Sequence, residues 1–82
     1  YQILGDCEMK LENYEEAISY YLKGMSCDGL NEKQLQEMSY NEIIAYEKLH
    51  DWSSAKAKIS AYVEKYPDDE KAKKEAEFLE TR

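Results

Sequence analysis

The sequence is poor in residues that interrupt helices or cross-link chains. Its 82 residues include 3 glycines, 1 proline and 2 cysteines. So little turn-forming material favours long helices, and two cysteines cannot build a disulfide framework or a zinc site. No apolar run approaches the roughly 20 residues that a membrane-spanning helix needs. Nothing at the N-terminus resembles a signal peptide.

Basic charge is also scarce, because 18 acidic residues face 11 basic ones and the net charge is -7. The excess is concentrated in residues 1–41, with a net charge of -5 against -2 in residues 42–82. An acidic surface repels nucleic acid and anionic lipid, so we expect neither as a partner, and no membrane insertion. Hydrophobic residues make up 43% of the chain, too many for a disordered acidic tail.

Apolar spacing and capping residues predict five helices, over 1–12, 14–28, 32–49, 52–66 and from 68 or 69 to 80. No alternating pattern typical of a β-strand is visible in the sequence. The turns within the first two helix pairs are only two or three residues long, which forces neighbouring helices to be antiparallel. The predicted fold is therefore all-α, with two helical hairpins followed by a single helix.

The helix ends and faces follow from individual residues. The predicted N-caps, the first two with Glu16 or Gln34 at the capping-box spacing, are Asn13, Asn31 and Asp51. Gly29 is expected to end the second helix in a left-handed conformation, and Pro67 to stop the fourth. The predicted inward face of the first helix is Leu4, Cys7 and Leu11. That of the later helices includes Ala17, Ile18, Tyr21, Met25, Met38, Ile43, Ala55, Ile59, Tyr62, Ala72, Ala76 and Leu79.

A short segment recurs in the two hairpins. Residues 13–17 (NYEEA) and 51–55 (DWSSA) both read cap, aromatic, two polar residues and alanine, at an offset of 38 residues. Leu11 and Leu49 each lie three residues before the aromatic. The hairpins are thus one unit used twice, which is the pattern of a helical repeat protein.

On these residues the chain resembles the tetratricopeptide repeat family, whose unit of about 34 residues has a W-x2-L-G-x2-Y, A, F, P pattern. The matching positions are Tyr1, Leu4, Gly5, Tyr14, Ala17, Tyr21 and Gly24 in the first unit and Tyr46, Trp52, Ala55, Ile59 and Pro67 in the second. The departures are Glu8, Gly29, Glu42, Ile43 and Tyr62. Tyrosines 1, 14, 21 and 46 occupy core positions of the family pattern.

The resemblance covers nearly the whole chain and implies one domain. Its first repeat would span about 1–29, its second about 30–67, and a capping helix with a polar outer face that includes Glu75 about 68–82. Hairpins of this family stack in a right-handed superhelix. One repeat cannot bury its own apolar face, so we expect further repeats upstream of Tyr1.

The family binds extended peptides or partner helices on its concave face, which is lined by the first helix of each unit. The positions that map there by register are Gln2, Asp6, Met9, Lys10, Tyr40, Asn41, Ile44, Glu47 and Lys48. Tyr40 is the predicted anchor, since interfaces favour tyrosine. The alternative is that these side chains are ordinary solvated residues.

One subgroup of the family holds a C-terminal carboxylate in a clamp of lysine, asparagine and arginine. Here Asn41 and Lys71 match that pattern, but Gln2, Asp6 and Glu75 do not. Asp6 would also repel a carboxylate. We therefore do not expect this chain to bind chaperone tails.

No pattern for catalysis, a metal ion or a cofactor is present, so we expect a non-enzyme without a cofactor. His50 is interpreted as a helix-end residue, favoured there by the helix dipole. Cys7 and Cys27 are predicted to lie roughly 10 Å apart along the hairpin, too far for a disulfide. Both are expected to be small core residues.

The main hypothesis is a non-catalytic protein-interaction scaffold that presents a groove to a peptide or protein with basic or mixed charge. A first alternative is a self-association module that forms a homodimer through the exposed face of the N-terminal hairpin. A second is an accessory segment of a larger enzyme or regulator. Acidic repeat chains occur in the cytoplasm and in bacterial surface lipoproteins, and the sequence leaves both compartments open.

Overall fold

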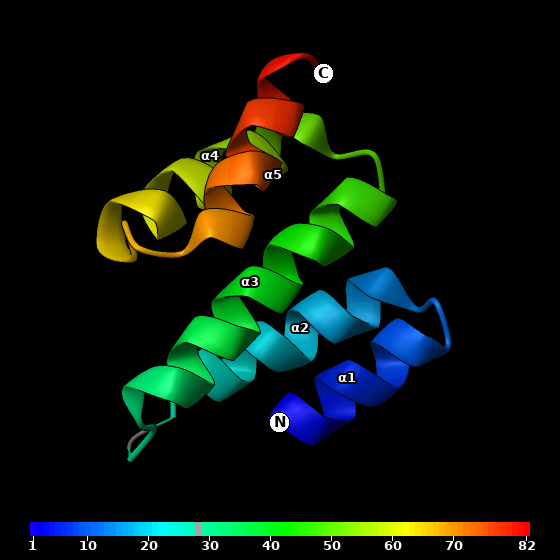
Figure 1. Ribbon diagram of the computed structural model, residues 1–82. Coiled ribbons are helices and arrows are strands. Elements are labelled where there is room, and N and C mark those ends of the chain that lie inside the picture. Colours follow the sequence, from blue (N-terminus) through cyan, green and yellow to red (C-terminus); the bar gives the residue numbers. More distant parts are fainter. Residues whose placement is uncertain (28) are drawn as a thin grey trace.

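The computed structural model describes residues 1–27 and 29–82, and over these residues it contains five helices and no strand (Figure 1). The helices are α1 (Gln2–Lys10), α2 (Tyr14–Met25), α3 (Glu32–Lys48), α4 (Trp52–Lys65) and α5 (Glu70–Glu80). This confirms the predicted all-α class. The molecule measures 31 × 26 × 17 Å along its principal axes.

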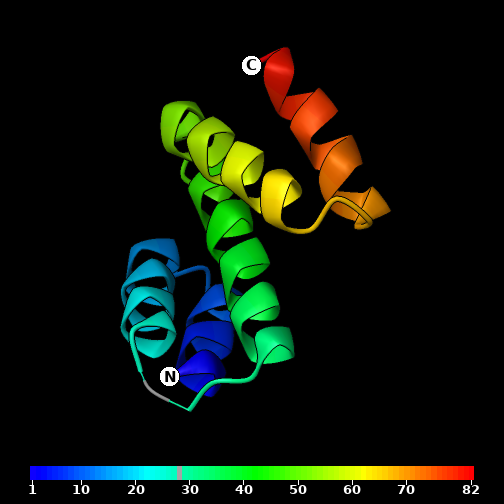
Figure 2. The same cartoon turned by 90° about the vertical axis from the view of Figure 1, so that its left-hand side faces the viewer.

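Each helix packs against the next in the chain, and α1 also contacts α3. The longest helix is α3, with 17 residues. Figure 2 shows α1 and α2 beside one half of α3, while α4 and α5 lie at its other half. Because α3 contacts both α2 and α4, it connects the α1–α2 pair with the α4–α5 pair, and α1 and α5 lie on either side of one of its faces.

Side-chain capping fixes where three of the helices begin. Asn31 and Gln34 form the predicted capping box, with N–O distances of 2.8 and 3.2 Å. Asp51 accepts a hydrogen bond from the backbone of Ser54, as predicted, and Asp69 caps α5 in the same way. The capping box predicted at Asn13 is wrong, since its side chain makes no cap bond and its amide donates to Glu8 instead.

The observed helix ends agree only in part with those predicted from the sequence. The second helix ends at Met25, earlier than predicted, and its predicted end at Asp28 lies outside the described residues. Gly29 does adopt the left-handed conformation, with φ of +83°, but in the connection before α3 rather than at the end of α2. The fourth helix ends at Lys65, two residues before Pro67, as a proline stop predicts.

The first of two core clusters lies between α1, α2 and the start of α3. Its fully buried members are Ala17, Tyr21 and Met38, with Met9 packed against them. Gly5 faces this cluster closely, because a Cβ atom there would lie 2.5 Å from the Tyr21 ring. Only glycine allows α1 to approach α2 at this point.

This close approach explains why the predicted inward face of the first helix is wrong. Gly5 and Met9, one helical turn apart, point toward α2, so the opposite side of α1 faces outward. Leu4 and Leu11 are 48% and 66% exposed, respectively. The leucine stripe predicted to face inward is therefore not the side of α1 that contacts α2. The contact is made on the side of Gly5, because the absence of a side chain there lets the Tyr21 ring approach.

The same geometry corrects the assignment of the cysteines to the core. Cys7 and Cys27 are both free and both exposed. Cys7 follows the inward Gly5 by two residues and therefore points to the outer side of α1. Cys27 lies after the end of α2, where its thiol donates to the carbonyl of Lys23. Tyr1, expected at a core position, is also exposed and stacks on Tyr20 instead.

The second core cluster joins α3, α4 and α5. Its buried members are Ile43, Ala55, Ile59, Tyr62, Ala72 and Leu79, which confirms the inward faces predicted for α4 and α5. Glu42 is buried beside these residues, with 3% of its surface exposed. Its nearest charge partner is Lys58, with Nζ 3.8 Å from Oε2.

Candidate functional site

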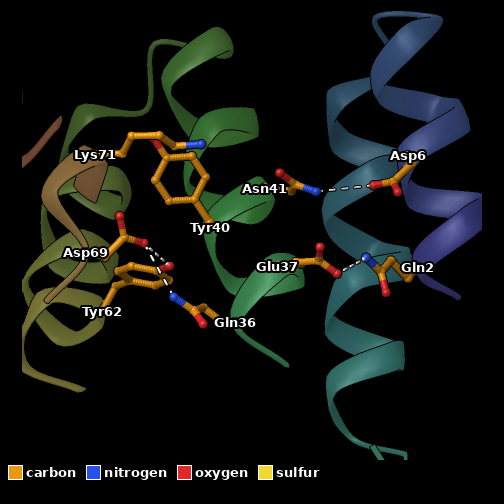
Figure 3. Close-up of a pocket in the computed structure, with 9 residues that line it drawn as sticks. All are labelled: Gln2, Asp6, Gln36, Glu37, Tyr40, Asn41, Tyr62, Asp69 and Lys71. Carbon is orange, nitrogen blue, oxygen red and sulfur yellow. Dashed lines mark hydrogen bonds between the residues drawn. The ribbon is translucent and has the colours of Figure 1, made fainter. Parts of the chain in front are cut away.

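Two of the hollows that border α3 are also lined by α5, and Figure 3 shows the first of them. This hollow has a volume of about 330 Å³. From α1 it is lined by Gln2 and Asp6, and from the α4–α5 side by Tyr62, Asp69 and Lys71. Side chains of α3 stand between these two walls: Gln36, Glu37, Tyr40 and Asn41.

The second hollow has a volume of about 390 Å³ and lies at the C-terminal half of α3. The residues that line it are Ile44, Glu47, Lys48, His50, Trp52, Glu75 and Phe78. Its walls are mixed, with rings from the α3–α4 turn, the start of α4 and α5, and carboxylates from α3 and α5. The sequence placed Glu75 on the polar outer face of the last helix, whereas it faces this hollow.

The same sides of α3 and α5 border both hollows. Residues 40, 44 and 47 follow one another on one side of α3, and residues 71, 75 and 78 do so on α5. Each stripe contributes to both hollows. We call the two hollows together the groove, with α3 as its floor, α5 as one wall and α1 as the opposite wall of the first hollow only.

The α1 wall is held to α3 by side-chain hydrogen bonds. Gln2 donates to Glu37 over 3.1 Å, and Asn41 donates to Asp6 over 3.2 Å, as the dashed lines in Figure 3 mark. The same Oδ1 atom of Asp6 accepts a bond of 2.5 Å from the Tyr21 hydroxyl. Asp6 and Asn41 are therefore engaged within the protein and shape the groove.

The opposite wall is organised around Asp69. Tyr62 donates to its carboxylate over 2.7 Å and Gln36 over 3.4 Å. The Tyr62 hydrogen bond is the main reason that the pKa of Asp69 lies below its usual value. Burial, followed by the bond to Asp69, raises the pKa of Tyr62 to about 12. Lys71 lies 5.3 Å from the centre of the Tyr40 ring, within the range of a cation–π contact.

Two carboxyl groups meet in the second hollow. Burial, and next the neighbouring carboxyl of Glu75, raise the pKa of Glu47 to about 7. The positive charge of Lys48 lowers the pKa of Glu47, but this effect is smaller than those of burial and Glu75. Glu47 therefore binds its proton more tightly than an ordinary carboxylate on a helix surface.

Aromatic rings line the other side of the second hollow. Trp52 stacks on His50 at a ring separation of 5.4 Å. The guanidinium of Arg82 lies 4.0 Å from the centre of the Phe78 ring and 6.0 Å from that of Trp52. These rings present π-faces to which cations bind.

The nine residues predicted to face a ligand divide into three groups. Gln2, Asp6, Tyr40 and Asn41 line the first hollow, and Ile44, Glu47 and Lys48 line the second. Met9 packs against the first core cluster instead, and exposed Lys10 lines neither of these hollows.

Sequence reasoning missed Asp69, Phe78 and Trp52, and it considered Lys71 and Glu75 only as positions of a carboxylate clamp. Asp69, Lys71, Glu75, Phe78 and Trp52 all line the groove, although the family register assigns its concave face to the first helix of each unit. The spacing of Lys71, Glu75 and Phe78 on one side of the last helix was the available signal.

Within residues 1–27 and 29–82 no group of three or more histidine, cysteine, aspartate or glutamate side chains is arranged to hold a metal ion. None of the helices in the described part of the chain is long and apolar enough to cross a membrane. Comparison with models of protein families, with curated proteins and with solved structures finds no match to this chain.

Proposed function

We propose that the chain is a non-catalytic protein-interaction module that binds a basic peptide segment in the groove. The charge of the groove carries this proposal. Five carboxylates line the two hollows, and two lysines accompany them. A surface with this excess of negative charge attracts a positively charged segment and speeds its association.

The carboxylates of the groove differ in how available they are. Asp6 and Asp69 each accept bonds from two side chains of the protein. Glu37, which is exposed, accepts one from Gln2. With Glu47 and Glu75 in the second hollow, three carboxylates are left to meet cationic groups of a ligand.

Apolar surface between these charges supplies the anchor that a bound peptide needs. Tyr40 and Ile44 are half-buried and lie on the floor between the two hollows. Tyrosine at the centre of an interface contributes a large apolar ring with little loss of entropy. The resemblance to tetratricopeptide repeats supports the same reading, since that family binds peptides on the side formed by α1 and α3.

The test is a screen of basic peptides of about ten residues, with affinity measured by fluorescence anisotropy. Ile44→Ala and Tyr40→Ala should each weaken the best peptide by about tenfold, as loss of a central contact does. Ile3→Ala, at a position 77% exposed outside the groove, is the matched control and should change nothing. Circular dichroism verifies that each variant is folded, because Tyr40 also packs against the second core.

Two results would overturn the proposal. One is a groove variant that is fully helical and binds with unchanged affinity. The other is binding that ignores ionic strength, because contacts between a basic peptide and exposed carboxylates must weaken as salt screens them. Acidic or neutral peptides serve as the negative set in the same screen.

Self-association is a second candidate, favoured by the apolar side chains on the outside of α1 and α2. The exposed large hydrophobic residues of this hairpin are Tyr1, Ile3, Leu4, Leu11 and Leu22. An isologous dimer would pair this face with its copy. Sedimentation at increasing concentration should then show a dimer that the double variant Leu4→Glu, Leu11→Glu dissociates. A chain that is monomeric at all concentrations would exclude this candidate.

A further inference from the structure

The second hollow combines two features that occur separately on most protein surfaces. Its carboxylates, Glu47 and Glu75, are close enough to raise the pKa of Glu47. Its aromatic rings, Trp52 and Phe78, line the same hollow from the start of α4 and from α5. A group that fits such a site is both cationic and flat.

The structure contains one group of that kind on these rings. The guanidinium of Arg82 lies 4.0 Å from the Phe78 ring centre and 6.0 Å from that of Trp52. This contact is an observation independent of the acidic pair, and it shows that the two rings accept a guanidinium. Arg82 is not among the residues that line the second hollow. A ligand guanidinium that stacks on these rings would therefore enter from the hollow and take the place that Arg82 holds on them.

We propose that the second hollow binds the guanidinium of one arginine side chain of the bound peptide, between the carboxylates of Glu47 and Glu75 and the rings of Trp52 and Phe78. This inference rests on the proposed function and adds a specificity to it. The groove then selects an arginine at one peptide position rather than basic residues in general.

Arginine suits this hollow better than lysine. Its planar group stacks on an aromatic face and donates through several N–H bonds at once, so it can bind two carboxylates side by side. An ammonium group is a compact and strongly hydrated charge with no flat face. A guanidinium also replaces the proton that Glu47 holds near neutral pH, because a nearby cation favours the ionised carboxylate. Binding should therefore release protons at pH 7.

The spacing along α3 sets where the arginine lies in the peptide. Tyr40 and Glu47 are separated by seven residues, which is about 10.5 Å along a helix. An extended peptide covers that distance in about three residues. We therefore expect the arginine about three positions from the residue that contacts Tyr40.

The only tryptophan of the chain reports directly on this hollow. Fluorescence of Trp52 is followed while N-acetyl-arginine amide is added, with N-acetyl-citrulline amide as the uncharged probe of the same shape. We expect a saturable change for the arginine compound, with a dissociation constant on the order of 1 mM, and none for the citrulline compound. Equal responses to both, or no response to arginine, would overturn the proposal.

Two glutamate variants of equal charge sharpen this test. Glu75→Gln should weaken arginine amide binding at least fivefold and reduce the protons released, measured calorimetrically in buffers of different ionisation enthalpy. Glu77→Gln, on the same helix but exposed and outside the hollow, should leave both quantities unchanged. If Glu75→Gln and Glu77→Gln weaken binding equally, arginine is attracted only by the overall negative charge, and the proposal of a specific arginine site is contradicted.

A citrulline scan of the best basic peptide separates this inference from the proposed function. If one position dominates, and its effect disappears in Glu75→Gln, the arginine site is supported. If the peptide binds and responds to Ile44→Ala but every arginine contributes equally, the proposed function stands and the arginine site is wrong. If no basic peptide binds, the proposed function fails, and the arginine amide titration still decides on the site.

Discussion

The hydroxyl of Tyr21 lies 2.5 Å from a carboxylate oxygen of Asp6, so the first core cluster and the groove share a hydrogen bond. The same oxygen accepts from Asn41 on α3, so α1, α2 and α3 meet at one carboxylate. Burial and then the bond to Asp6 raise the pKa of Tyr21 far above its usual value. The α1 wall of the groove is thus positioned by a residue that no ligand reaches.

Removing the Tyr21 hydroxyl should loosen this wall. A hydrogen bond to a charged group contributes about 1.5 to 3 kcal/mol, and Asn41 still satisfies Asp6 in part. We expect Tyr21→Phe to lower the free energy of unfolding by about 1.5 kcal/mol, measured by urea denaturation. Tyr14→Phe is the control, since that hydroxyl has no hydrogen-bond partner among the described residues. Equal losses in the two variants would show that the Asp6 bond contributes nothing.

Gly5 is expected to be the least replaceable glycine of the chain. Alanine there improves helix propensity by about 1 kcal/mol, but its Cβ would lie 2.5 Å from the Tyr21 ring. Overpacking of this kind costs about 1 to 3 kcal/mol, and moving the ring also breaks its bond to Asp6. We expect a net loss of about 2 kcal/mol for Gly5→Ala in thermal or urea denaturation.

Gly29→Ala serves as the comparison for Gly5→Ala. Apart from its two chain neighbours, a Cβ at Gly29 meets no atom of the described residues within 4 Å, but its φ of +83° strains any other residue. The cost of a left-handed alanine is about 1 kcal/mol. A larger loss for Gly29→Ala than for Gly5→Ala would contradict the packing argument.

The sequence predicted the elements of this fold better than their faces. Caps such as Asn31 and Asp51 act through neighbours three residues away, so local sequence determines them. The inward face of α1 depends instead on a partner sixteen residues away, since Tyr21 can approach only where Gly5 leaves space. Leucines on that helix therefore suggested a face that the structure turns outward.

In the candidate site too, features set by local sequence were predicted and features set by contacts between distant helices were not. Tyr40 and Asn41 were found from repeat register, because that register is a local property of α3. Phe78 was missed, and Glu75 was placed on the outer face, because their positions depend on how α5 packs against α4 beside α3. Met9 was assigned to the groove, but the contact of α1 with α2 draws it into the core.

Stability should fall as the pH rises toward neutrality. The pKa of Glu47 is about 7 in the folded chain against an ordinary value of 4.5, so the folded state binds more protons between these values. Stability then decreases from about pH 4.5 to pH 7 and levels off above. Burial shifts the pKa of Glu42 in the same direction and adds to the effect.

Unfolding midpoints in urea from pH 5 to pH 8 test this dependence. Glu47→Gln removes one titrating group and should flatten the decline, whereas Glu77→Gln should leave its slope unchanged. Lowered pKa values at Asp69 and Glu32 act only at lower pH, below their ordinary range, so they do not interfere. A slope in Glu47→Gln identical to that of the unmodified chain would show that Glu47 does not titrate in this window.

Glu42 is the least favourable residue of the second core. Its Oε2 is buried without a hydrogen-bond partner among the described residues, and Lys58 is 3.8 Å away, too far for such a bond. Replacing a buried ionic group by an apolar one of similar size is often neutral or stabilising. We expect Glu42→Met to raise the free energy of unfolding by about 1 kcal/mol, with a higher thermal midpoint.

Lys58→Met should have the opposite effect, although it also replaces a charge by an apolar side chain. It leaves the buried carboxylate of Glu42 without its only ion-pair partner in the described structure. The Lys58 side chain is 45% exposed, so water screens the pair, and we expect a loss of about 1 kcal/mol rather than the full cost of an isolated buried charge. Lys74→Met, at an exposed position on α5, controls for the loss of a surface lysine. If the unpaired charge of Glu42 causes the loss of stability in Lys58→Met, removing that charge should restore stability. A double variant Glu42→Met, Lys58→Met that is no more stable than Lys58→Met alone would contradict this explanation.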